Sequence, residues 1–437
     1  MTRLYPAEGP LRGSIRVPGD KSICHRGVMF GGLAGAFSTI RGFSGGADNL
    51  STIGVLRSLG AVVEQDGKTV RVRGGALSSS PTPLDCGNSG TTMRLMAGLL
   101  AGLGLESTLV GDASLHARPM ERVAGPLRER GLRVDTTHGR PPILVRAGGS
   151  FVTGEVHLRV ASAQVKSCLL LAALGRQAPL TVYEPHPSRD HTENMLRAMG
   201  VAIESSPHYA HPGASEGPAW VRMEAHSTPL NPVTIDVPGD ISSAAFWLCA
   251  GALVPGSRVE LPACGVSPTR AGVLEALATA GVCVTRRNEV SSGGEPIADL
   301  CVEPGASTGM TVPAEMVPRL VDEVPVLAVL AARLPGASIF HGVGELRVKE
   351  CDRLAATLRL LAACGARAEV QGDDLHVHGQ PGVPFRAFEF DPEHDHRMAA
   401  AATIAAQVAD GVSTVKHVEC LAVSYPDFLA DLEALRS

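Results

Sequence analysis

Charged and hydroxyl side chains stand together at the start of an apolar segment near the N-terminus. Lys21, Ser22 and Arg26 follow Asp20, and their spacing puts them on or beside one face of a helix. The free N–H groups and the positive dipole end at a helix start attract phosphate and carboxylate groups. Two cations and a hydroxyl at this place therefore indicate an anion-binding site. The alternative is a pair of solvated surface charges, but these residues open an otherwise apolar helix.

Further clusters of polar residues occur along the chain. Residues 85–94, DCGNSGTTMR, combine glycines that let a ligand approach the backbone with polar capping side chains, without the GxxxxGK[ST] pattern of a nucleotide triphosphate site. Arg118 precedes a proline, which favours an extended backbone and a guanidinium that can bind carboxylate or phosphate. Three further clusters stay open to two interpretations each. VKECDR (348–353) and DHR (395–397) could bind an anion or form an internal ion-pair network. SRDHTE (188–193) could bind an anion or only cap a helix and cover its first turn.

The positions of these clusters indicate internal repetition. VPGD occurs at residues 17–20 and again at 237–240. Six small-residue apolar stretches, 68 to 82 residues apart, begin at residues 20, 88, 162, 240, 322 and 395. A second pattern recurs five times between these stretches. It has helical spacing, ends on glycine and leads into alternating β-branched residues. We therefore predict six units of strand, helix, strand, helix and strands, three before about residue 240 and three after it. Residues 205–218 are predicted to be a surface-loop insertion.

Length and composition restrict the class of protein. A chain of 437 residues with 44% hydrophobic residues can bury two cores, so two domains are expected. The formal net charge of -5 argues against a nucleic-acid coat or a basic membrane binder. The ten cysteines form no CxxC pair, which favours a reducing compartment. Without a signal-peptide pattern or an apolar run of about 18 residues, the chain is expected to be cytoplasmic.

Nine strings in order along the chain resemble the 5-enolpyruvylshikimate-3-phosphate (EPSP) synthase family. They are GDKSICHR, GNSGTTMRL, RPM, SAQVKS, SRDHTE, VDEVPVLA, ELRVKECDR, DHRMA and SYPDF. SAQVKS and SRDHTE are closer to the second bacterial class of this family. The resemblance implies an α/β fold of two similar globular domains, each built from three βαβαββ units as an inside-out α/β barrel. It places one domain at residues 16–236, on the shikimate 3-phosphate side, and the other at 1–15 with 237–437, with the active site in the cleft between them.

The resemblance also implies a reaction. The family transfers the carboxyvinyl group of phosphoenolpyruvate to the 5-hydroxyl of shikimate 3-phosphate by addition and elimination, and releases phosphate. This step belongs to the shikimate pathway to chorismate and the aromatic amino acids. It needs no metal and no organic cofactor, and it is the target of glyphosate. Both substrates are phosphorylated carboxylates, which agrees with the cationic clusters.

The family's site residues carry over to matching positions. Shikimate 3-phosphate is expected to contact Lys21, Ser22, Arg26, Ser162, Ala163, Gln164, Arg189, Asp322 and Lys349. Phosphoenolpyruvate is expected to be surrounded by Lys21, Gly90, Arg118, Gln164, Arg353 and Arg397. We predict Asp322 as the base, Glu350 as the acid and Lys21 as the cation that stabilises the shared anionic centre. Ala163 stands where the first class has serine, and Gly90 keeps the glycine that should let glyphosate enter.

The sequence disfavours two rival functions. The sister enolpyruvyl transferase that acts on UDP-N-acetylglucosamine carries a reactive cysteine near an RP dipeptide, whereas GDASLHA precedes Arg118 here. A binding scaffold without catalysis is disfavoured because Lys21, Asp322, Glu350 and Arg397 are all present. The expected partners are the two small-molecule substrates, with no nucleic acid and no membrane, and the chain is expected to be a monomer.

Overall fold

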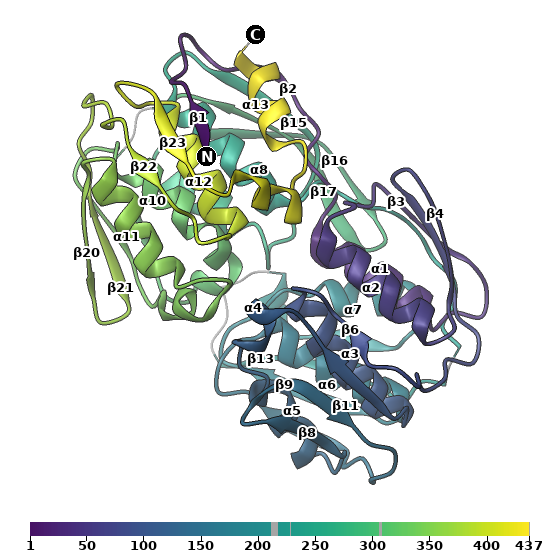
Figure 1. Ribbon diagram of the computed structural model, residues 1–437. Helices are drawn as coiled ribbons and strands as arrows, with labels where there is room; N and C mark the ends of the chain where they lie inside the picture. The colour runs from purple at the N-terminus through teal and green to yellow at the C-terminus, as the bar shows by residue number, and fades with distance from the viewer. Residues whose placement is uncertain (211–216, 228, 306–307, 437) are drawn as a thin grey trace. The chain divides into compact units, whose positions relative to one another are not determined.

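Two compact units make up the computed structural model, which describes residues 1–210, 217–227, 229–305 and 308–436 (Figure 1). The N-half unit comprises Gly19–Val237 and Ser291–Glu295, and the C-half unit comprises Met1–Pro18, Pro238–Val290 and Pro296–Ser437. The predicted ranges placed 291–295 in the second domain. These residues join the N-half unit because Ser292 Oγ accepts a hydrogen bond from Asp236 N at 3.0 Å and Glu295 Oε1 lies 3.0 Å from His191 Nδ1.

The N-half unit contains three sheets of one topology. Their strand orders are β14-β3-β5-β4, β6-β7-β9-β8 and β10-β11-β13-β12, and in each sheet the first two strands are parallel and the others antiparallel. The elements are, in chain order, α1 (Lys21–Gly31), β3 (Ser38–Arg41), α2 (Ala47–Ser58), β4 (Val62–Asp66), β5 (Thr69–Arg73), β6 (Leu84–Asp85), α3 (Gly90–Leu103), β7 (Ser107–Val110), α4 (Ala113–His116), α5 (Glu121–Glu129), β8 (Val134–Thr137), β9 (Arg140–Val145), β10 (Gly154–His157), α6 (Ala163–Gly175), β11 (Leu180–Glu184), α7 (His191–Ala198), β12 (Ile203–Ser205), the 3-10 turn η1 (Pro207–Tyr209), β13 (Ala219–Met223) and β14 (Thr234–Asp236).

The C-half unit repeats this topology with one shorter sheet. Its strand orders are β2-β15-β17-β16, β18-β19-β21-β20 and β22-β23-β1. The elements are β1 (Thr2–Leu4), β2 (Arg12–Ser14), α8 (Ile241–Leu253), β15 (Arg258–Gly265), α9 (Gly272–Thr279), β16 (Cys283–Ser292), β17 (Glu295–Glu303), β18 (Thr311–Val312), η2 (Val317–Arg319), η3 (Val321–Glu323), α10 (Val324–Ala331), β19 (Ala337–Phe340), η4 (Gly344–Val348), α11 (Arg353–Ala363), β20 (Arg367–Gln371), β21 (Asp374–His378), β22 (Glu389–Phe390), α12 (His396–Ala406), β23 (Ser413–Val415), η5 (Val418–Val423) and α13 (Phe428–Arg436).

The first strand of the leading sheet in each unit comes from a distant part of the chain. β14, at the end of the N-half unit, pairs in parallel with β3. β2, near the N-terminus, pairs in parallel with β15. The strand before each VPGD copy therefore completes a sheet more than 190 residues away along the chain, since Ile235 pairs with Ile40 and Gly13 with Val259. These two pairings between distant strands were not predicted from the sequence.

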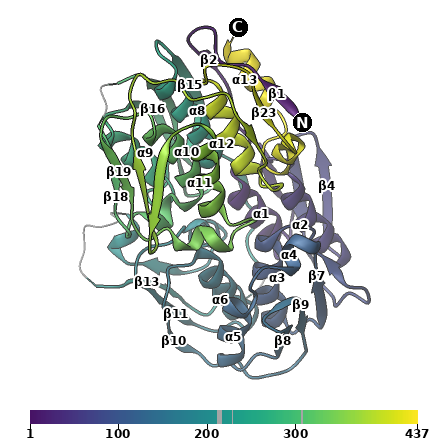
Figure 2. The ribbon, with the colours of Figure 1, turned by 60° about the vertical axis from the view of Figure 1, so that its left-hand side comes forward.

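The inner helices consist mostly of apolar residues, because they are covered on nearly every side. In the N-half unit, α3 and α6 lie side by side (Figure 2). A Cβ added to Gly98 of α3 would lie 2.1 Å from the carbonyl oxygen of Cys168 in α6, so only glycine permits this approach. In the C-half unit, α8, α10 and α12 contact one another, and every residue of α10 is buried. Helices of this kind form the core of each unit.

Four of the six predicted helix starts coincide with N-cap residues. Asp20, Ser162, Asp240 and Asp395 are N-caps at predicted starts, and each side chain accepts a backbone hydrogen bond from the first turn. The predicted second start is one residue early, because Ser89 rather than Asn88 caps α3. The fifth start differs more, because residue 322 lies in the 3-10 turn η3 and α10 begins only at Val324. The glycines predicted to end the second helices all have positive φ, namely Gly60, Gly131, Gly200, Gly281 and Gly365.

The predicted surface loop at 205–218 is only partly described. Residues 211–216 lie outside the described part of the chain. The segment before them is only partly on the surface. Pro207–Tyr209 forms the turn η1, in which Pro207 is exposed, but Tyr209 is buried and its hydroxyl donates to Glu184. Tyr209 is buried because its phenol ring covers Lys166, a charged side chain of the core, at 4.4 Å from Nζ to the ring centroid.

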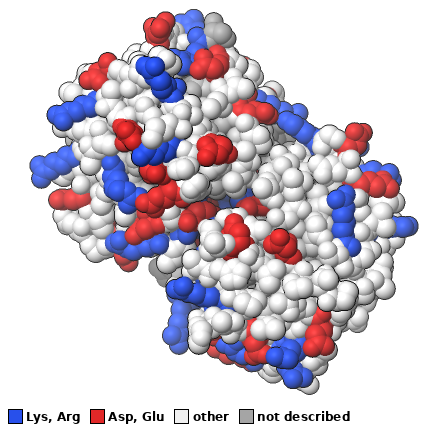
Figure 3. All heavy atoms as spheres, viewed as in Figure 1, with Lys and Arg blue, Asp and Glu red and all other residues white. Residues whose placement is uncertain are grey.

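The exterior carries mixed charge. On the face drawn in Figure 3, basic and acidic side chains of the described residues are interspersed. No helix in the described ranges combines the length and the apolar character that are needed to cross a bilayer.

The contact between α3 and α6 can be tested with two glycine variants. Gly98→Ala should lower the free energy of unfolding by about 1–3 kcal/mol, because a methyl group 2.1 Å from a carbonyl oxygen forces the helices apart. Gly54→Ala in α2 is the control, because a Cβ there meets nothing within 4 Å and should stabilise the helix by about 0.5–1 kcal/mol. Denaturant unfolding measures both. Equal effects of the two variants would contradict the close packing.

Candidate active site

The start of α1 holds Lys21 and Ser22 on a fixed backbone. Asp20 accepts a hydrogen bond from Ile23 N at 2.9 Å and caps the helix. The ammonium group of Lys21 forms an ion pair with Asp48, while its backbone carbonyl accepts a hydrogen bond from Asn49 Nδ2 at 3.0 Å. The Lys21 side chain is 20% exposed, so an anion can reach it. Ser22 is half-buried beside it.

Arg26 lies one turn further along α1, where it is buried. Its Nε donates to Thr192 Oγ1 at 2.7 Å, and its two terminal nitrogens donate to Ser167 Oγ at 3.0 Å and to Ser22 O at 3.0 Å. Burial lowers the pKa of Arg26 to about 10, although the nearby carboxylate of Glu193 opposes this change. The guanidinium is still charged at neutral pH, and neutral acceptors hold it in place.

The start of α3 brings Gly90 and Arg118 together. A Cβ added to Gly90 would lie 3.2 Å from Arg94 Nη1 and 3.4 Å from Arg118 Nη1. Arg118 donates to Asn88 Oδ1, and Asn88 Nδ2 donates to Asp112 Oδ2 at 2.8 Å. The guanidinium therefore has a fixed orientation beside the first turn of α3, where both the helix dipole and the arginines favour an anion.

Arg94 connects this helix start to the next one. Its Nη1 donates to Gln164 Oε1 at 2.6 Å, and its Nη2 donates to Pro119 O at 3.2 Å. Gln164 Nε2 in turn donates to Thr91 Oγ1 at 3.1 Å. The predicted residue Gln164 is thus held at the start of α6 by two contacts to α3.

The start of α6 carries Ser162 and Ala163. Ser162 is the N-cap, and its hydroxyl also accepts a hydrogen bond from Arg122 Nη2 at 3.2 Å. Its backbone N–H donates to Glu184 Oε1 at 3.0 Å. Ala163 is half-buried at the first position of the helix. Arg189, which is also half-buried, lies in the loop before α7.

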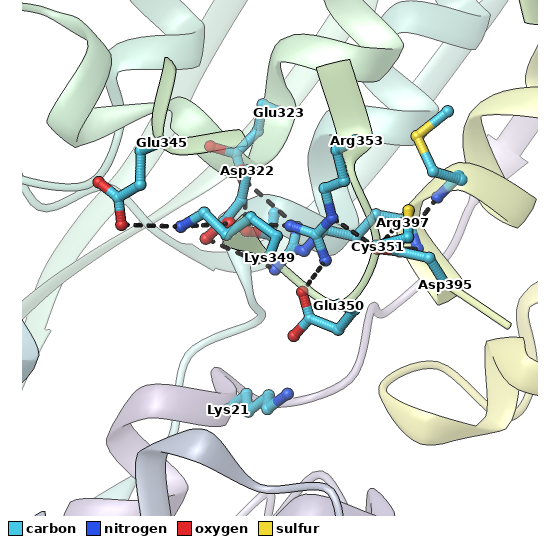
Figure 4. A network of polar contacts seen from close by, with 12 residues as sticks. Lys21, Asp322, Glu323, Glu345, Lys349, Glu350, Cys351, Arg353, Asp395 and Arg397 are labelled. Atoms are coloured by element: carbon cyan, nitrogen blue, oxygen red, sulfur yellow. Dashed lines mark hydrogen bonds and ion pairs between the residues drawn. The ribbon is translucent and has the colours of Figure 1, made fainter. Parts of the chain in front are cut away.

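Arg353 is the centre of a second cluster, in the C-half unit (Figure 4). Its side chain is 1% exposed, and all three of its nitrogens donate to carboxylates. Nε bonds to Asp395 Oδ2 at 2.7 Å, Nη1 to Asp322 Oδ1 at 3.1 Å and Nη2 to Glu350 Oε2 at 2.6 Å. The predicted base and the predicted acid therefore share one guanidinium.

The pKa values of this cluster reflect strong pairing. Burial by itself disfavours the charge on Arg353, but Asp395, Glu350 and Asp322 outweigh it and raise the pKa of Arg353. Burial likewise raises the pKa of Asp395, but Arg353 outweighs it and the pKa of Asp395 falls below its usual value. Both groups therefore stay charged at neutral pH.

Lys349 and Arg397 complete the cluster around Asp322. Lys349 Nζ lies 3.2 Å from Glu345 Oε1 and 3.6 Å from Asp322 Oδ1. Arg397 lies 3.9 Å from Asp322 and 3.5 Å from Glu323. Lys349 donates a hydrogen bond to Glu345. The distances from Lys349 and Arg397 to Asp322 are longer than hydrogen bonds, so these two cations balance the charge of Asp322 without a direct hydrogen bond to it.

Each unit gathers its own predicted site residues. In the C-half unit, one network joins all the predicted residues, which are Asp322, Lys349, Glu350, Arg353 and Arg397. In the N-half unit, Arg94 lies between Gly90 and Gln164, whereas Arg26 makes a separate set of contacts with α6 and α7. The contacts of these residues with substrates stay predictions.

Several polar residues of the two clusters were missed from sequence. Arg94 follows Gly90 by four residues, so helical spacing could have placed both on one face. Arg122 stands in the same string as Arg118, ARPMER. Arg270, which donates to Glu323 Oε2 at 2.9 Å and also contacts Ser242, carries no comparable signal because its partners are distant in sequence.

Comparison with known proteins identifies the family of the chain. The family model of EPSP synthase (3-phosphoshikimate 1-carboxyvinyltransferase) matches residues 6–432. The 3-phosphoshikimate 1-carboxyvinyltransferase of Synechococcus sp. (strain RCC307) is 44% identical, over 98% of this chain and 98% of that relative. The enzyme of the same name from Shouchella clausii (strain KSM-K16) is 42% identical, over 99% of this chain and 98% of that relative.

Solved structures agree with this assignment. The 2.37 Å structure of EPSP synthase from Acinetobacter baumannii has a TM-score of 0.85 and 37% identity, and the match covers 99% of this chain and 97% of that one. The enolpyruvyl transferase NikO from Streptomyces tendae, at 20% identity and a TM-score of 0.77, shares the fold. The predicted fold class and the predicted family are thus confirmed. Because the family model and the relatives span nearly the whole chain, the chain belongs to the EPSP synthase (3-phosphoshikimate 1-carboxyvinyltransferase) family.

Proposed function

We propose that this chain transfers the carboxyvinyl group of phosphoenolpyruvate to the 5-hydroxyl of shikimate 3-phosphate and releases phosphate. The observation that carries the proposal is the position of Asp322 and Glu350 on the single guanidinium of Arg353, in a chain of this family. Addition to an enol ether requires one group that accepts a proton and another that donates one. Two carboxyl groups held by one cation meet this requirement.

The N-half cluster is proposed to bind the anionic groups of the substrates. Lys21 and Ser22 lie at one helix start, and Gly90 with Arg118 lies at another. Helix N-termini and arginine forks both favour phosphate and carboxylate. The buried position of Arg26 suits a contact with one fixed group, because its side chain has little freedom to move. That the two units hold the substrates in a cleft between them stays a prediction.

The proposed base and the proposed acid need opposite protonation states at the start of the reaction. Hydrogen bonds from Arg353 favour the carboxylate form of both Asp322 and Glu350. This suits Asp322, which takes the proton of the attacking hydroxyl as the new C–O bond forms at C2 of phosphoenolpyruvate. Glu350, whose side chain is 25% exposed, has to loosen its contact with Arg353 before it carries a proton. An anionic substrate that binds Arg353 would provide this change.

The two steps then balance. Glu350 gives its proton to the methylene carbon, and the product of addition is a tetrahedral intermediate. In the second step the C–O bond to phosphate breaks and phosphate leaves with the electron pair, while Glu350 takes a proton back from the methyl carbon as the double bond forms again. The proton held by Asp322 passes to the departing phosphate, so both carboxyl groups return to their starting states. Lys21 is proposed to stabilise the negative charge at the reacting centre.

The rival substrate is disfavoured by the residues near Arg118. The sister transferase that uses UDP-N-acetylglucosamine is expected to carry a cysteine before this arginine, whereas residues 111–117 read GDASLHA. We further propose that the chain acts as a cytoplasmic monomer without a cofactor. Light scattering of the purified protein tests the oligomeric state, because a monomer has the mass of one chain, 45.4 kDa.

Phosphate release should require both shikimate 3-phosphate and phosphoenolpyruvate. A coupled phosphate assay with each substrate alone, and with UDP-N-acetylglucosamine in place of shikimate 3-phosphate, checks this requirement. Equal release with UDP-N-acetylglucosamine, or release with neither acceptor present, would exclude the proposed reaction.

Replacing Asp322 should nearly abolish turnover, while shikimate 3-phosphate should still bind. Asp322→Asn removes the proton acceptor without a large change in volume, so kcat should fall about 10²–10⁴-fold. Calorimetric binding of shikimate 3-phosphate should persist. Asp373→Asn is the control, because Asp373 is 66% exposed and pairs only loosely with Arg347, at 3.8 Å. Near-normal turnover of Asp322→Asn would remove this residue from the role of base.

A methyl group at Gly90 should affect phosphoenolpyruvate more than shikimate 3-phosphate. It would lie 3.2 Å and 3.4 Å from two guanidinium nitrogens, so Arg94 and Arg118 have to shift. We expect Gly90→Ala to raise the KM for phosphoenolpyruvate roughly tenfold, which corresponds to about 1.4 kcal/mol. Gly54→Ala provides a control in open space. A larger change in the KM for shikimate 3-phosphate would argue against this assignment.

A further inference from the structure

A fully buried ionic network lies behind the starts of α6 and α7 in the N-half unit. Lys166 Nζ lies 2.9 Å from Glu184 Oε2 and 2.7 Å from Glu193 Oε1, and all three side chains are 0% exposed. Lys166 also donates to Tyr209 Oη at 2.8 Å, and the phenol donates to Glu184 Oε2 at 2.6 Å. The proposed chemistry uses none of these four residues.

The pKa values of the three charged groups in the network shift for different reasons. Burial disfavours the ammonium of Lys166, but Glu184 and Glu193 outweigh it and raise the pKa of Lys166. Burial also raises the pKa of Glu184, but Lys166 and the hydroxyl donors outweigh it and lower that pKa. For Glu193 burial prevails, and its pKa is raised. Glu184 is therefore the carboxylate that the network keeps ionised.

Glu184 uses this charge to hold two segments that bear predicted ligands. Its Oε1 accepts hydrogen bonds from Ser162 N at 3.0 Å and from Ser188 Oγ at 2.7 Å. Ser162 is the N-cap of α6, and Ser188 immediately precedes Arg189. One carboxylate thus sets the position of the α6 start relative to the loop that carries Arg189. Lys166 supports the same loop by donating to Ser188 O at 3.3 Å.

Stability alone is a weak explanation for such a network. Burying charged groups is costly, and well-packed apolar residues of similar volume often stabilise a fold as well or better. A carboxylate that must orient a backbone N–H and a hydroxyl, by contrast, has no apolar substitute. The distribution of its contacts therefore favours a positioning role.

We propose that Glu184 is a positioning residue that sets the affinity for the phosphorylated acceptor substrate by fixing Ser162 against the Arg189 loop. This proposal rests on the proposed function and on the contacts with shikimate 3-phosphate that are expected of Ser162 and Arg189. Glu184 acts through them and does not itself touch the substrate.

Glu184→Gln tests the proposal with little change in volume. The variant should fold, because Gln is close to Glu in volume and Lys166 still donates to Tyr209 Oη at 2.8 Å and to Ser188 O at 3.3 Å. The new amide has one acceptor oxygen, and its NH₂ group faces donors such as the N–H of Ser162 and the hydroxyl of Ser188. We expect the calorimetric Kd and the KM for shikimate 3-phosphate to rise at least fivefold. The KM for phosphoenolpyruvate, measured at saturating shikimate 3-phosphate, should change less than twofold.

Arg176→Met is the matched control at the opposite end of α6. Arg176 donates to Ala101 O at 3.1 Å and to Gly148 O at 3.2 Å, so its loss should lower the unfolding midpoint without changing the Kd for shikimate 3-phosphate. Tyr209→Phe is the second variant, because it removes only the hydroxyl bonded to Glu184, and it should raise that Kd at least twofold. If Glu184→Gln does not fold, the Kd of Tyr209→Phe for shikimate 3-phosphate tests the positioning role of Glu184 in its place.

The outcomes separate the two proposals. A wild-type chain that neither binds nor turns over shikimate 3-phosphate contradicts the proposed function. If the wild-type chain is active and the folded Glu184→Gln variant binds shikimate 3-phosphate with an unchanged Kd, the positioning role is wrong while the function stands. The same holds if Arg176→Met weakens binding as much as Glu184→Gln does.

Discussion

Close packing of the inner helices is the constraint on which both charged clusters depend. Gly98 of α3 brings that helix into contact with the backbone of α6, and α10 is buried along its whole length. Helices in such a core have no polar face, so charged groups are accommodated mainly at their first turns. There, unsatisfied N–H groups and the helix dipole favour anions. The same turns therefore carry the capping carboxylates and the cations that are proposed to bind the substrates.

The two units balance their buried cations in different ways. In the N-half unit, Arg26 is held by two hydroxyls and a carbonyl, so its positive charge is not cancelled at close range by a hydrogen-bonded carboxylate. In the C-half unit, Arg353 donates to three carboxylates, and Lys349 and Arg397 lie beside one of them, Asp322. The first arrangement suits anion binding, and the second suits proton transfer, since carboxyl groups are its main components.

Local signals predicted most of the fold. Polar caps before apolar stretches located the helix starts at Asp20, Ser162, Asp240 and Asp395, because capping depends on residues within one turn. The helix-ending glycines were predicted for the same reason, since a left-handed residue is a local requirement. The parallel pairing of β14 with β3, and of β2 with β15, left no local trace, because short strands show only that they are extended and not which partner they meet.

Sequence alone determined the family, the repeat architecture and the residue types of the candidate site, because motifs and helix spacing are written along the chain. Tertiary structure decided which of these residues touch. The sharing of Arg353 by Asp322, Glu350 and Asp395 depends on three separate helix starts or turns. The burial of Tyr209 against Lys166, in a segment predicted as a loop, depends on a core cation that needs a polar partner. Such pairings cannot be predicted from spacing, because burial and charge balance arise only when distant segments pack together.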